Sequence, residues 1–236
     1  MHWSGGKDAT LSLYKLIQTK EYDISCLLTT LSESYRRVSM HGVRESLLDR
    51  QAKELGLPLQ KLFLPESTSM KTYSQLMETT LEAFCKKGVK HAAFGDIFLE
   101  DLKKYRDQQL SKVAMKGTYP LWKSSTTAIV HEFIDLGFKA VVACVDATHL
   151  DQSFAGRLID ADFLKDLPKN VDPCGENGEF HSFVFDGPLF QNPVSFQKGD
   201  IVYKTYPLKT KQKNTSDCSC TDEIEKGFWF CDLIPN

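Results

Sequence analysis

Apolar runs of strand length alternate with longer stretches of helical periodicity over about the first two-thirds of the chain. The strand-length runs lie at 23–31, 59–64, 90–95 and 138–145. The stretches with a helical spacing of apolar residues lie at 43–55, 70–87, 101–115 and 124–136. This alternation is typical of parallel strands joined by right-handed crossovers, with helices on both faces of the sheet. We therefore predict an α/β fold, in which ligands bind beyond the carboxyl ends of the strands.

The pattern changes after about residue 150. Residues 160–194 are rich in turn-forming residues, and 200–209 and 227–233 resemble antiparallel strands. The segment between these two strands, 210–226, is polar and charged, and we expect an exposed loop or a disordered tip there. The last third of the chain is therefore predicted to be organised differently from the first part.

A polar, glycine-containing segment, Ser4-Gly5-Gly6-Lys7-Asp8, precedes the first apolar-periodic stretch. Two adjacent glycines leave backbone N–H groups uncovered, and the start of a helix offers unpaired donors and a positive dipole end. The segment therefore predicts an anion site, although a glycine turn with a serine cap before an ordinary helix is an alternative reading. Residues 1–3 are short for a strand, so either the chain extends upstream or a neighbouring segment fills the gap.

Composition and charge narrow the class of protein. The chain has 236 residues, of which 42% are hydrophobic and 25% charged, with a net charge of −2. The near-neutral charge argues against nucleic acid as a partner, and no apolar run approaches the length of a membrane helix. The seven cysteines are scattered, and those at positions 26, 85 and 144 lie in apolar stretches. We expect a globular protein of the reducing cytoplasm.

Two further polar clusters follow predicted strands or precede helices. Ser39 and His41 precede a predicted helix, where they could cap it or contact a ligand. Asp96 follows Gly95 at a strand end, where it could hold a divalent cation, orient a ribose or cap the next helix. On that helix lie Tyr105 and Arg106, which either bind a ligand or belong to a solvated face.

The last clusters combine aromatic, acidic and imidazole groups. Trp122 could stack on an adenine or be buried. In 172–188, Glu176, Glu179 and His181 are separated by glycines, a set that could bind an amine, a metal or a cationic substrate, or form an acidic surface loop. The Cys218–Cys220 pair lacks the second pair of a structural zinc site. Neither a Walker A motif nor G-x-G-x-x-G is present.

Taken together, these stretches resemble one family. The segment SGGKDA at 4–9 resembles the SGGxDS loop of the PP-loop ATP pyrophosphatases. The segments SMHGV, GDI…YR, YPLW and GENGEFHSFVFDGP are similar, in that order, to the diphthine–ammonia ligase (diphthamide synthetase) family, whose hallmark is E-G-G-E-[YF]-E-[ST]. The similarity covers nearly the whole chain. In this chain Ala9 stands in place of a hydroxyl residue, Asn177 in place of glycine and His181 in place of glutamate.

The resemblance implies a parallel-sheet, HUP-like (PP-loop) ATP-binding domain over 1–122 and a smaller α+β substrate-binding domain over 123–236. It implies that backbone N–H groups, Lys7 and Mg²⁺ neutralise the phosphates of ATP. The expected catalytic residues are Lys7, Asp8, Glu176 and Glu179. The expected nucleotide-binding residues are Ser4, Gly5, Gly6, Lys7, Asp8, Gly95 and Asp96, with Asp8 and Asp96 as metal ligands. The expected substrate-binding residues are His41, Tyr105, Arg106, Trp122, Glu176, Gly178, Glu179, His181 and Ser182.

The implied reaction is an ATP-dependent amidation. A carboxylate attacks the α-phosphorus, pyrophosphate leaves, and ammonia then displaces AMP. The implied acceptor is the diphthine residue of elongation factor 2 or another carboxylate, and Glu176 and Glu179, with Phe180 or Trp122, could hold its trimethylammonium group. A homodimer is an open alternative. Two other functions are also open: a PP-loop enzyme that thiolates tRNA, and a module that binds nucleotide without catalysis.

Overall fold

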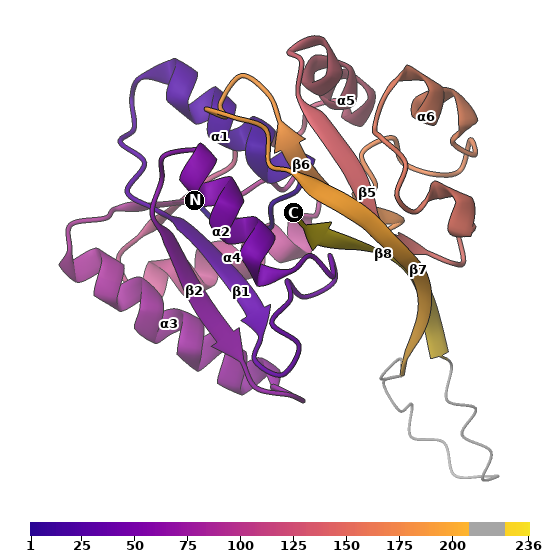
Figure 1. The fold of residues 1–236 in the computed structure, drawn as a ribbon. Coiled ribbons are helices and arrows are strands. Elements are labelled where there is room, and N and C mark those ends of the chain that lie inside the picture. The colour runs from indigo at the N-terminus through magenta and orange to yellow at the C-terminus, as the bar shows by residue number, and fades with distance from the viewer. Residues whose placement is uncertain (208–224) are drawn as a thin grey trace, which may run out of the picture.

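The computed structural model describes residues 1–207 and 225–236. The N-terminal part alternates strands and helices as predicted (Figure 1). The strands are β1 (Leu27–Ser32), β2 (Leu59–Leu64), β3 (His91–Ala93) and β4 (Lys116–Thr118). The helices are α1 (Lys7–Thr19), α2 (Glu45–Glu54), α3 (Met70–Lys86) and α4 (Glu100–Lys112). Strand β1 pairs in parallel with β2, and β3 pairs in parallel with β4, which confirms the predicted parallel pairing in this part.

Residues 1–3 join the two parallel pairs. The amide of His2 donates to the carbonyl of Ala93 at the end of β3, whereas the amide of Trp3 donates to the carbonyl of Leu28 in β1. The amide of Leu28 in turn donates to the carbonyl of Met1. The first three residues therefore lie between β1 and β3, and Ser4 follows them at the carboxyl edge of these strands. In open parallel sheets this edge is where ligands bind.

The C-terminal part contains an antiparallel sheet. Its strands are β5 (Lys139–Asp146), β6 (Phe180–Asp186), β7 (Phe196–Pro207) and β8 (Glu225–Pro235), in the order β6-β5-β8-β7. Its helical segments are α5 (Thr126–Asp135), η1 (Gln152–Phe154) and α6 (Ala161–Asp166). The antiparallel pairing predicted for 200–209 and 227–233 is confirmed over the described residues. The loop predicted for 210–226 lies outside the described residues, except that Glu225 and Lys226 begin β8.

The prediction that the strand at 138–145 continues the parallel pattern is wrong. Strand β5 pairs antiparallel with both β6 and β8. All of its residues from Ala140 to Asp146 are buried, because it is a central strand covered on both faces. A strand buried on both faces has a continuous apolar sequence whichever way its neighbours run, so its sequence does not reveal their direction.

A buried polar network joins the glycine segment to the antiparallel sheet. The amide of Val184 in β6 donates to the carbonyl of Gly5 at 2.9 Å. The buried Gln51 side chain in α2 donates to the carbonyls of both residues and accepts a hydrogen bond from the indole of Trp3 at 2.7 Å. Because every buried polar atom of this network has a partner, the network fixes the position of the N-terminal loop against β6.

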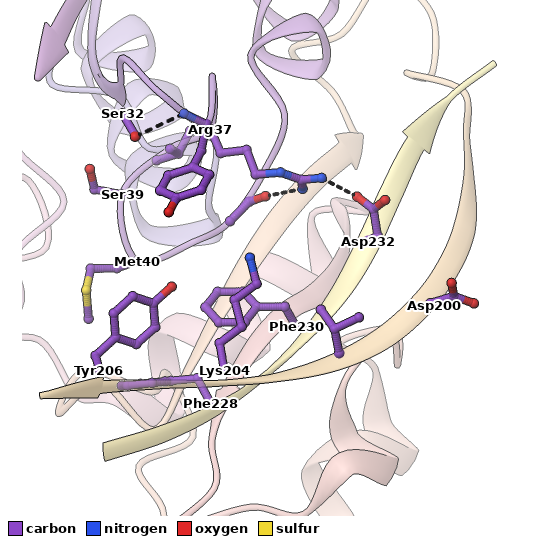
Figure 2. Close-up of a pocket in the computed structure, with 14 residues that line it drawn as sticks. Ser32, Arg37, Ser39, Met40, Asp200, Lys204, Tyr206, Phe228, Phe230 and Asp232 are labelled. Carbon is purple, nitrogen blue, oxygen red and sulfur yellow. Dashed lines mark hydrogen bonds and ion pairs between the residues drawn. The ribbon is translucent and has the colours of Figure 1, made fainter. Parts of the chain in front are cut away.

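The loop between β1 and α2, residues 33–44, is held against β8. The Asp232 carboxylate accepts hydrogen bonds from Arg37 at 2.9 Å (Figure 2) and from Arg44 at 2.6 Å. Gly42 packs so closely on the Phe230 ring that an added Cβ would lie 2.6 Å from a ring carbon. This loop separates two cavities. We name the one lined by Lys7 and Glu176 the catalytic cavity, and the one lined by Tyr35 and Lys204 the second cavity. No helix in the described ranges is long and apolar enough to cross a membrane.

Candidate active site

The glycine segment forms a tight entry into α1. Gly5 has a φ of +79°, and a Cβ at this position would lie 2.8 Å from the Leu48 side chain. Gly6 is the N-cap residue, and its amide donates to the Ser4 hydroxyl at 3.3 Å. The amide of Lys7 donates to the Ser182 hydroxyl of β6 at 3.1 Å. The first turn of α1 therefore faces the catalytic cavity with its positive dipole end, as expected for an anion site.

Lys7 and Asp8 form a close ion pair at this helix start. The Lys7 Nζ lies 2.7 Å and 2.8 Å from the two Asp8 carboxylate oxygens, and the lysine side chain is 2% exposed. Burial lowers the pKa of Lys7, but the charge and hydrogen bonds of Asp8, together with Cys174 and Glu176, outweigh that effect, so the net shift of the pKa is upward. Burial raises the pKa of Asp8 despite the opposing effect of Lys7. Lys7 is therefore a charged ammonium held in a buried position.

The segment after β3 passes directly over the first turn of α1. A Cβ at Gly95 would lie 2.8 Å from the Asp8 carbonyl carbon and 2.9 Å from the Ala9 amide nitrogen. Only glycine allows this approach of two backbones. The next residue, Asp96, forms an ion pair with Arg106 of α4 at 3.2 Å. Burial raises the pKa of Asp96, and Arg106 opposes that rise.

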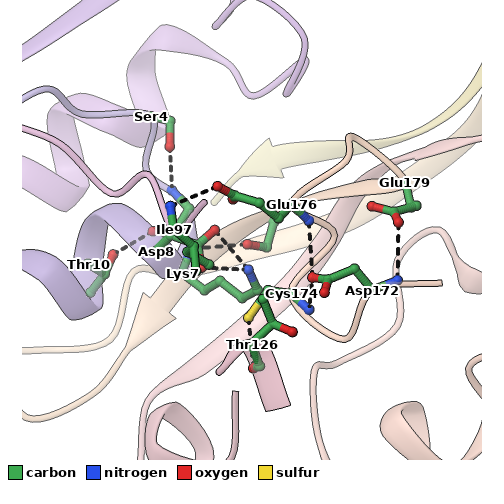
Figure 3. Close-up of polar contacts among 12 residues, drawn as sticks. Ser4, Lys7, Asp8, Thr10, Ile97, Thr126, Asp172, Cys174, Glu176 and Glu179 are labelled. Atoms are coloured by element: carbon green, nitrogen blue, oxygen red, sulfur yellow. Dashed lines mark hydrogen bonds and ion pairs between the residues drawn. The ribbon is translucent and has the colours of Figure 1, made fainter. Parts of the chain in front are cut away.

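The loop before β6 brings a third carboxyl group to the cavity. Glu176 Oε1 accepts a hydrogen bond from the amide of Ile97 at 2.8 Å (Figure 3). Burial raises the pKa of Glu176 to about 7, with a further upward effect from Asp8 and Asp96 that Lys7 and the Ile97 amide oppose. Glu176 can therefore exchange a proton near neutral pH.

Glu179 lies in the same loop but does not line the cavity. It is 2% exposed, and its oxygens accept hydrogen bonds from the amides of Asp172 and Asn177 and from the Asn177 side chain. Figure 3 shows its carboxylate hydrogen-bonded to the amide of Asp172. These hydrogen bonds lower the pKa of Glu179 in spite of its burial. The side chain thus orders the loop that carries Glu176.

Two imidazoles stack at the wall of the cavity. The rings of His41 and His181 lie 4.5 Å apart. Because a carbonyl oxygen can only accept, His41 Nδ1 donates to the Ser182 carbonyl, at 3.3 Å. Burial lowers the pKa of His41 to about 4, and burial with the neighbouring His41 lowers that of His181 well below its usual value. Both rings are neutral at pH 7, so His181 brings no charge to the position of a hallmark glutamate.

The catalytic cavity has a volume of about 440 Å³ and brings together most of the predicted site. The predicted residues that line it are Ser4, Gly6, Lys7, Asp8, His41, Gly95, Asp96, Arg106, Glu176, Gly178, His181 and Ser182. The predicted residues that do not line it are Gly5, Tyr105, Trp122 and Glu179. The Tyr105 hydroxyl is hydrogen-bonded to Ser74 of α3, and the Lys103 ammonium lies 5.6 Å from the Trp122 ring.

Several lining residues have no counterpart in the prediction, among them His2, Tyr73 and Cys174. His2 stacks on Phe94, and its buried Nε2 has no hydrogen-bond partner within the described part of the chain. Its place two residues before the glycine segment was the available signal. The ring of Phe180 also lines the cavity, and the Lys7 ammonium lies 5.8 Å from its centre. The position near Phe180 that was expected to hold a trimethylammonium group is therefore occupied by the ammonium group of Lys7.

The cavity offers two carboxylates, Asp8 and Asp96, that could hold a divalent cation. The described residues contain no group of three or more His, Cys, Asp or Glu side chains arranged to bind a metal. A Mg²⁺ ion that enters with a nucleotide needs only one or two carboxylates, because phosphate oxygens and waters complete its coordination. The residues present therefore fit Mg²⁺ bound together with a nucleotide.

Comparison with known proteins identifies the family to which the chain belongs. The model of the diphthamide synthase N-terminal domain matches residues 1–117, and that of the diphthamide synthase C-terminal domain matches 125–213. A diphthine–ammonia ligase of Danio rerio is 23% identical over 224 residues, 84% of this chain and 86% of the relative. The Homo sapiens protein of the same name is 23% identical over 84% of this chain and 82% of its own length. The chain belongs to the diphthamide synthase family.

Proposed function

We propose that the chain is an ATP-dependent ligase that converts a carboxylate into an amide with ammonia and releases AMP and pyrophosphate. One observation carries this proposal: the start of α1, the buried Lys7 ammonium and the Glu176 carboxyl group face one cavity at the carboxyl edge of a parallel sheet. A phosphate-binding end and a group that titrates near neutral pH are both needed for adenylation followed by amide formation. The names of the curated relatives agree with this reaction.

ATP is the substrate that binds at the helix start. The first-turn amides of α1, the Ser4 hydroxyl and the Lys7 ammonium would contact its phosphates. We assign 1–122 as a HUP-like ATP-binding domain and 123–236 as a smaller substrate-binding domain. The parallel pairing of the first part and the antiparallel sheet of the second support this division. Mg²⁺, held by Asp8 and Asp96, would supply further neutralisation of the phosphates.

The chemistry has two steps. The acceptor carboxylate oxygen attacks the α-phosphorus, the bond to the bridging oxygen breaks, and pyrophosphate leaves with its electron pair. Lys7 stabilises the negative charge that develops on the phosphates. Ammonia then attacks the acyl carbon, AMP leaves with the oxygen, and the nitrogen loses one proton. Glu176, with a pKa of about 7, is placed in the cavity to accept that proton.

The acceptor is the diphthine residue of elongation factor 2 or a related carboxylate. The curated relatives carry the name diphthine–ammonia ligase. The neutral His181 in place of a glutamate changes the charge beside the reaction centre, which favours testing further carboxylates alongside diphthine.

The test is a product analysis with [¹⁵N]ammonium, ATP and a panel of carboxylates that includes diphthine-containing elongation factor 2. We expect AMP, pyrophosphate and ¹⁵N-amide in equal amounts. Lys7→Gln should lower kcat/KM for AMP formation by about 100-fold or more, because it removes a charge that stabilises the transition state. Lys15→Gln is the matched control on the same helix, since Lys15 pairs with Glu132 of α5 and lies outside the cavity. It should change kcat/KM less than about twofold.

The outcomes separate the proposal from its alternatives. Formation of ADP and phosphate, or full activity of Lys7→Gln, would contradict the proposed chemistry. Sulfur transfer to tRNA with AMP formation would indicate the thiolation enzyme instead. Binding of ATP without exchange of labelled pyrophosphate, with every acceptor supplied, would indicate a nucleotide-binding module.

A further inference from the structure

A second cavity lies on the other side of the 33–44 loop. It has a volume of about 420 Å³ and is enclosed by this loop and by β7 and β8. Aromatic rings form much of its wall, from Tyr35, Tyr206, Phe228 and Phe230 (Figure 2). The volume is within the range of sites for small organic ligands. The SMHGV motif contributes Ser39, Met40 and Gly42 to its wall, but the sequence did not predict a cavity there.

The second cavity adjoins the catalytic cavity. Three consecutive residues, Val38, Ser39 and Met40, line both. The rim at this point is open, since Met40 is 60% exposed and Tyr35 is 64% exposed. A ligand in the second cavity can therefore extend past Met40 toward Lys7 without crossing the core of the protein.

The charged groups that line the second cavity differ in their pairing. They are two positive groups, Arg37 and Lys204, and two negative groups, Asp200 and Asp232. Arg37 and the neighbouring Arg44 are both bound to Asp232. Among the described residues Lys204 forms no ion pair, and Figure 2 places Asp200 well away from its ammonium group.

The Lys204 ammonium occupies the position that a cationic ligand would need. It lies 5.7 Å from the centre of the Tyr35 ring and 6.0 Å from that of Phe230. An aromatic wall alone would suit a quaternary ammonium group. With a lysine already above two of the rings, a second cation is repelled, whereas an anionic group on an apolar or flat body gains both contacts.

We propose that the second cavity binds the non-reacting part of the acceptor, and that this part is a flat or apolar body bearing an anionic group. The reacting carboxylate then extends past Ser39 and Met40 into the catalytic cavity. This inference rests on the proposed amidation and selects, among the proposed acceptors, a carboxylate other than diphthine, because the trimethylammonium group of diphthine is itself cationic. It assigns Lys204 as a residue that determines specificity, with no part in adenylation.

The test compares three probes that share one ring system and differ in charge: 2-naphthylacetate, 2-naphthylacetamide and (2-naphthylmethyl)trimethylammonium. Their dissociation constants are measured on the full chain by calorimetry, without ATP. We expect the anion to bind at least fivefold more tightly than the cation. Lys204→Gln should abolish that preference, and Lys204→Glu should reverse it. The control Lys198→Glu makes the same charge change on β7 outside the cavity and should leave the preference intact.

Equal binding of the three probes, or a preference that Lys204→Glu does not alter, would overturn the inference. Because binding is measured without ATP, its failure is independent of the reaction: AMP formation that depends on Lys7 would then stand alone. If the anion binds through Lys204 but no carboxylate yields AMP, the proposed function fails and the ligand site remains. As a further arm, 2-naphthylacetate should raise KM for the acceptor and leave KM for ATP unchanged.

Discussion

The two cavities are built by different means. In the catalytic cavity, backbone segments in close contact define the shape: Gly95 touches the first turn of α1, and Lys7 is 2% exposed in a tight ion pair. In the second cavity, side chains define the shape, and Tyr35 and Met40 at its rim are more than half exposed. A substitution can replace one side chain at an open rim and leave the others in place. A substitution at a contact between two backbones forces the segments apart.

This difference assigns a separate task to each cavity. A site fixed by backbone contact keeps one geometry, which suits the phosphates of ATP and the reaction common to the family. A site lined by aromatic side chains, of which Tyr35 and Tyr206 are exposed, and by a lysine without an ion-pair partner in the described ranges can change its ligand through a few substitutions. Variants of the first cavity should therefore affect ATP turnover, and variants of the second should affect the choice of acceptor.

Among the substitutions that test this comparison of the two cavities, the largest effect is expected from Gly95→Ala. The new Cβ would meet the backbone of Asp8 and Ala9 at 2.8–2.9 Å, so the start of α1 must move. We expect kcat/KM for ATP to fall about 100-fold, because misplacement of reacting groups has effects of that order. Overpacking should also lower Tm by about 4–10 °C, as measured by scanning calorimetry.

Gly88→Ala is the control for that substitution. Gly88 has a φ of +88°, but an added Cβ would have no neighbour within 4 Å. We expect a loss of about 2–4 °C in Tm from backbone strain alone and unchanged turnover of ATP. Comparable losses of activity in both variants would show that the backbone contact at Gly95 has no special role.

An intermediate effect is expected from Asp232→Asn. This change leaves Arg37 and Arg44 without their shared carboxylate at the edge of the second cavity. The added positive charge should tighten binding of 2-naphthylacetate about threefold, with unchanged KM for ATP. Loss of the ion pairs should lower Tm by about 2–4 °C. A change in KM for ATP with no change in probe binding would contradict the separation of tasks.

The last prediction concerns the contribution of Glu176 to stability, since the pKa of this residue is raised from 4.5 to about 7. The folded state therefore holds this proton more tightly than the unfolded state, and the carboxyl group destabilises the fold increasingly as pH rises from about 4.5 to 7. Glu176→Gln removes this destabilising carboxyl group. The Tm of the variant should therefore exceed that of the natural protein only slightly at pH 5 and by about 3–6 °C at pH 7.5. A gain that shrinks as pH rises would contradict the pKa shift.

Local sequence patterns predicted the elements and the edge of the sheet on which the site lies. The strand at 59–64 and the helix start after Gly6 follow from apolar spacing and glycine position, which depend on near neighbours. The direction of β5 could not be predicted this way, because burial on both faces gives the same sequence in either direction.

The sequence could predict those site residues that directly follow a strand or a glycine turn. Asp96 and Glu176 reach the cavity for that reason. Glu179 does not reach the cavity, because amide groups of its own loop bind its carboxylate. The loop conformation that brings these amides close could not be predicted from the sequence. The second cavity combines residues 32–42 with 200–206 and 228–232, and no local motif connects segments so far apart.

The most direct test of the central claim is a crystal structure of the chain with α,β-methylene-ATP and Mg²⁺. We predict that the phosphates lie at the first turn of α1, within hydrogen-bond distance of the Ser4 hydroxyl and in contact with Lys7. Phosphates bound in the second cavity, or elsewhere with the start of α1 left empty, would contradict the account.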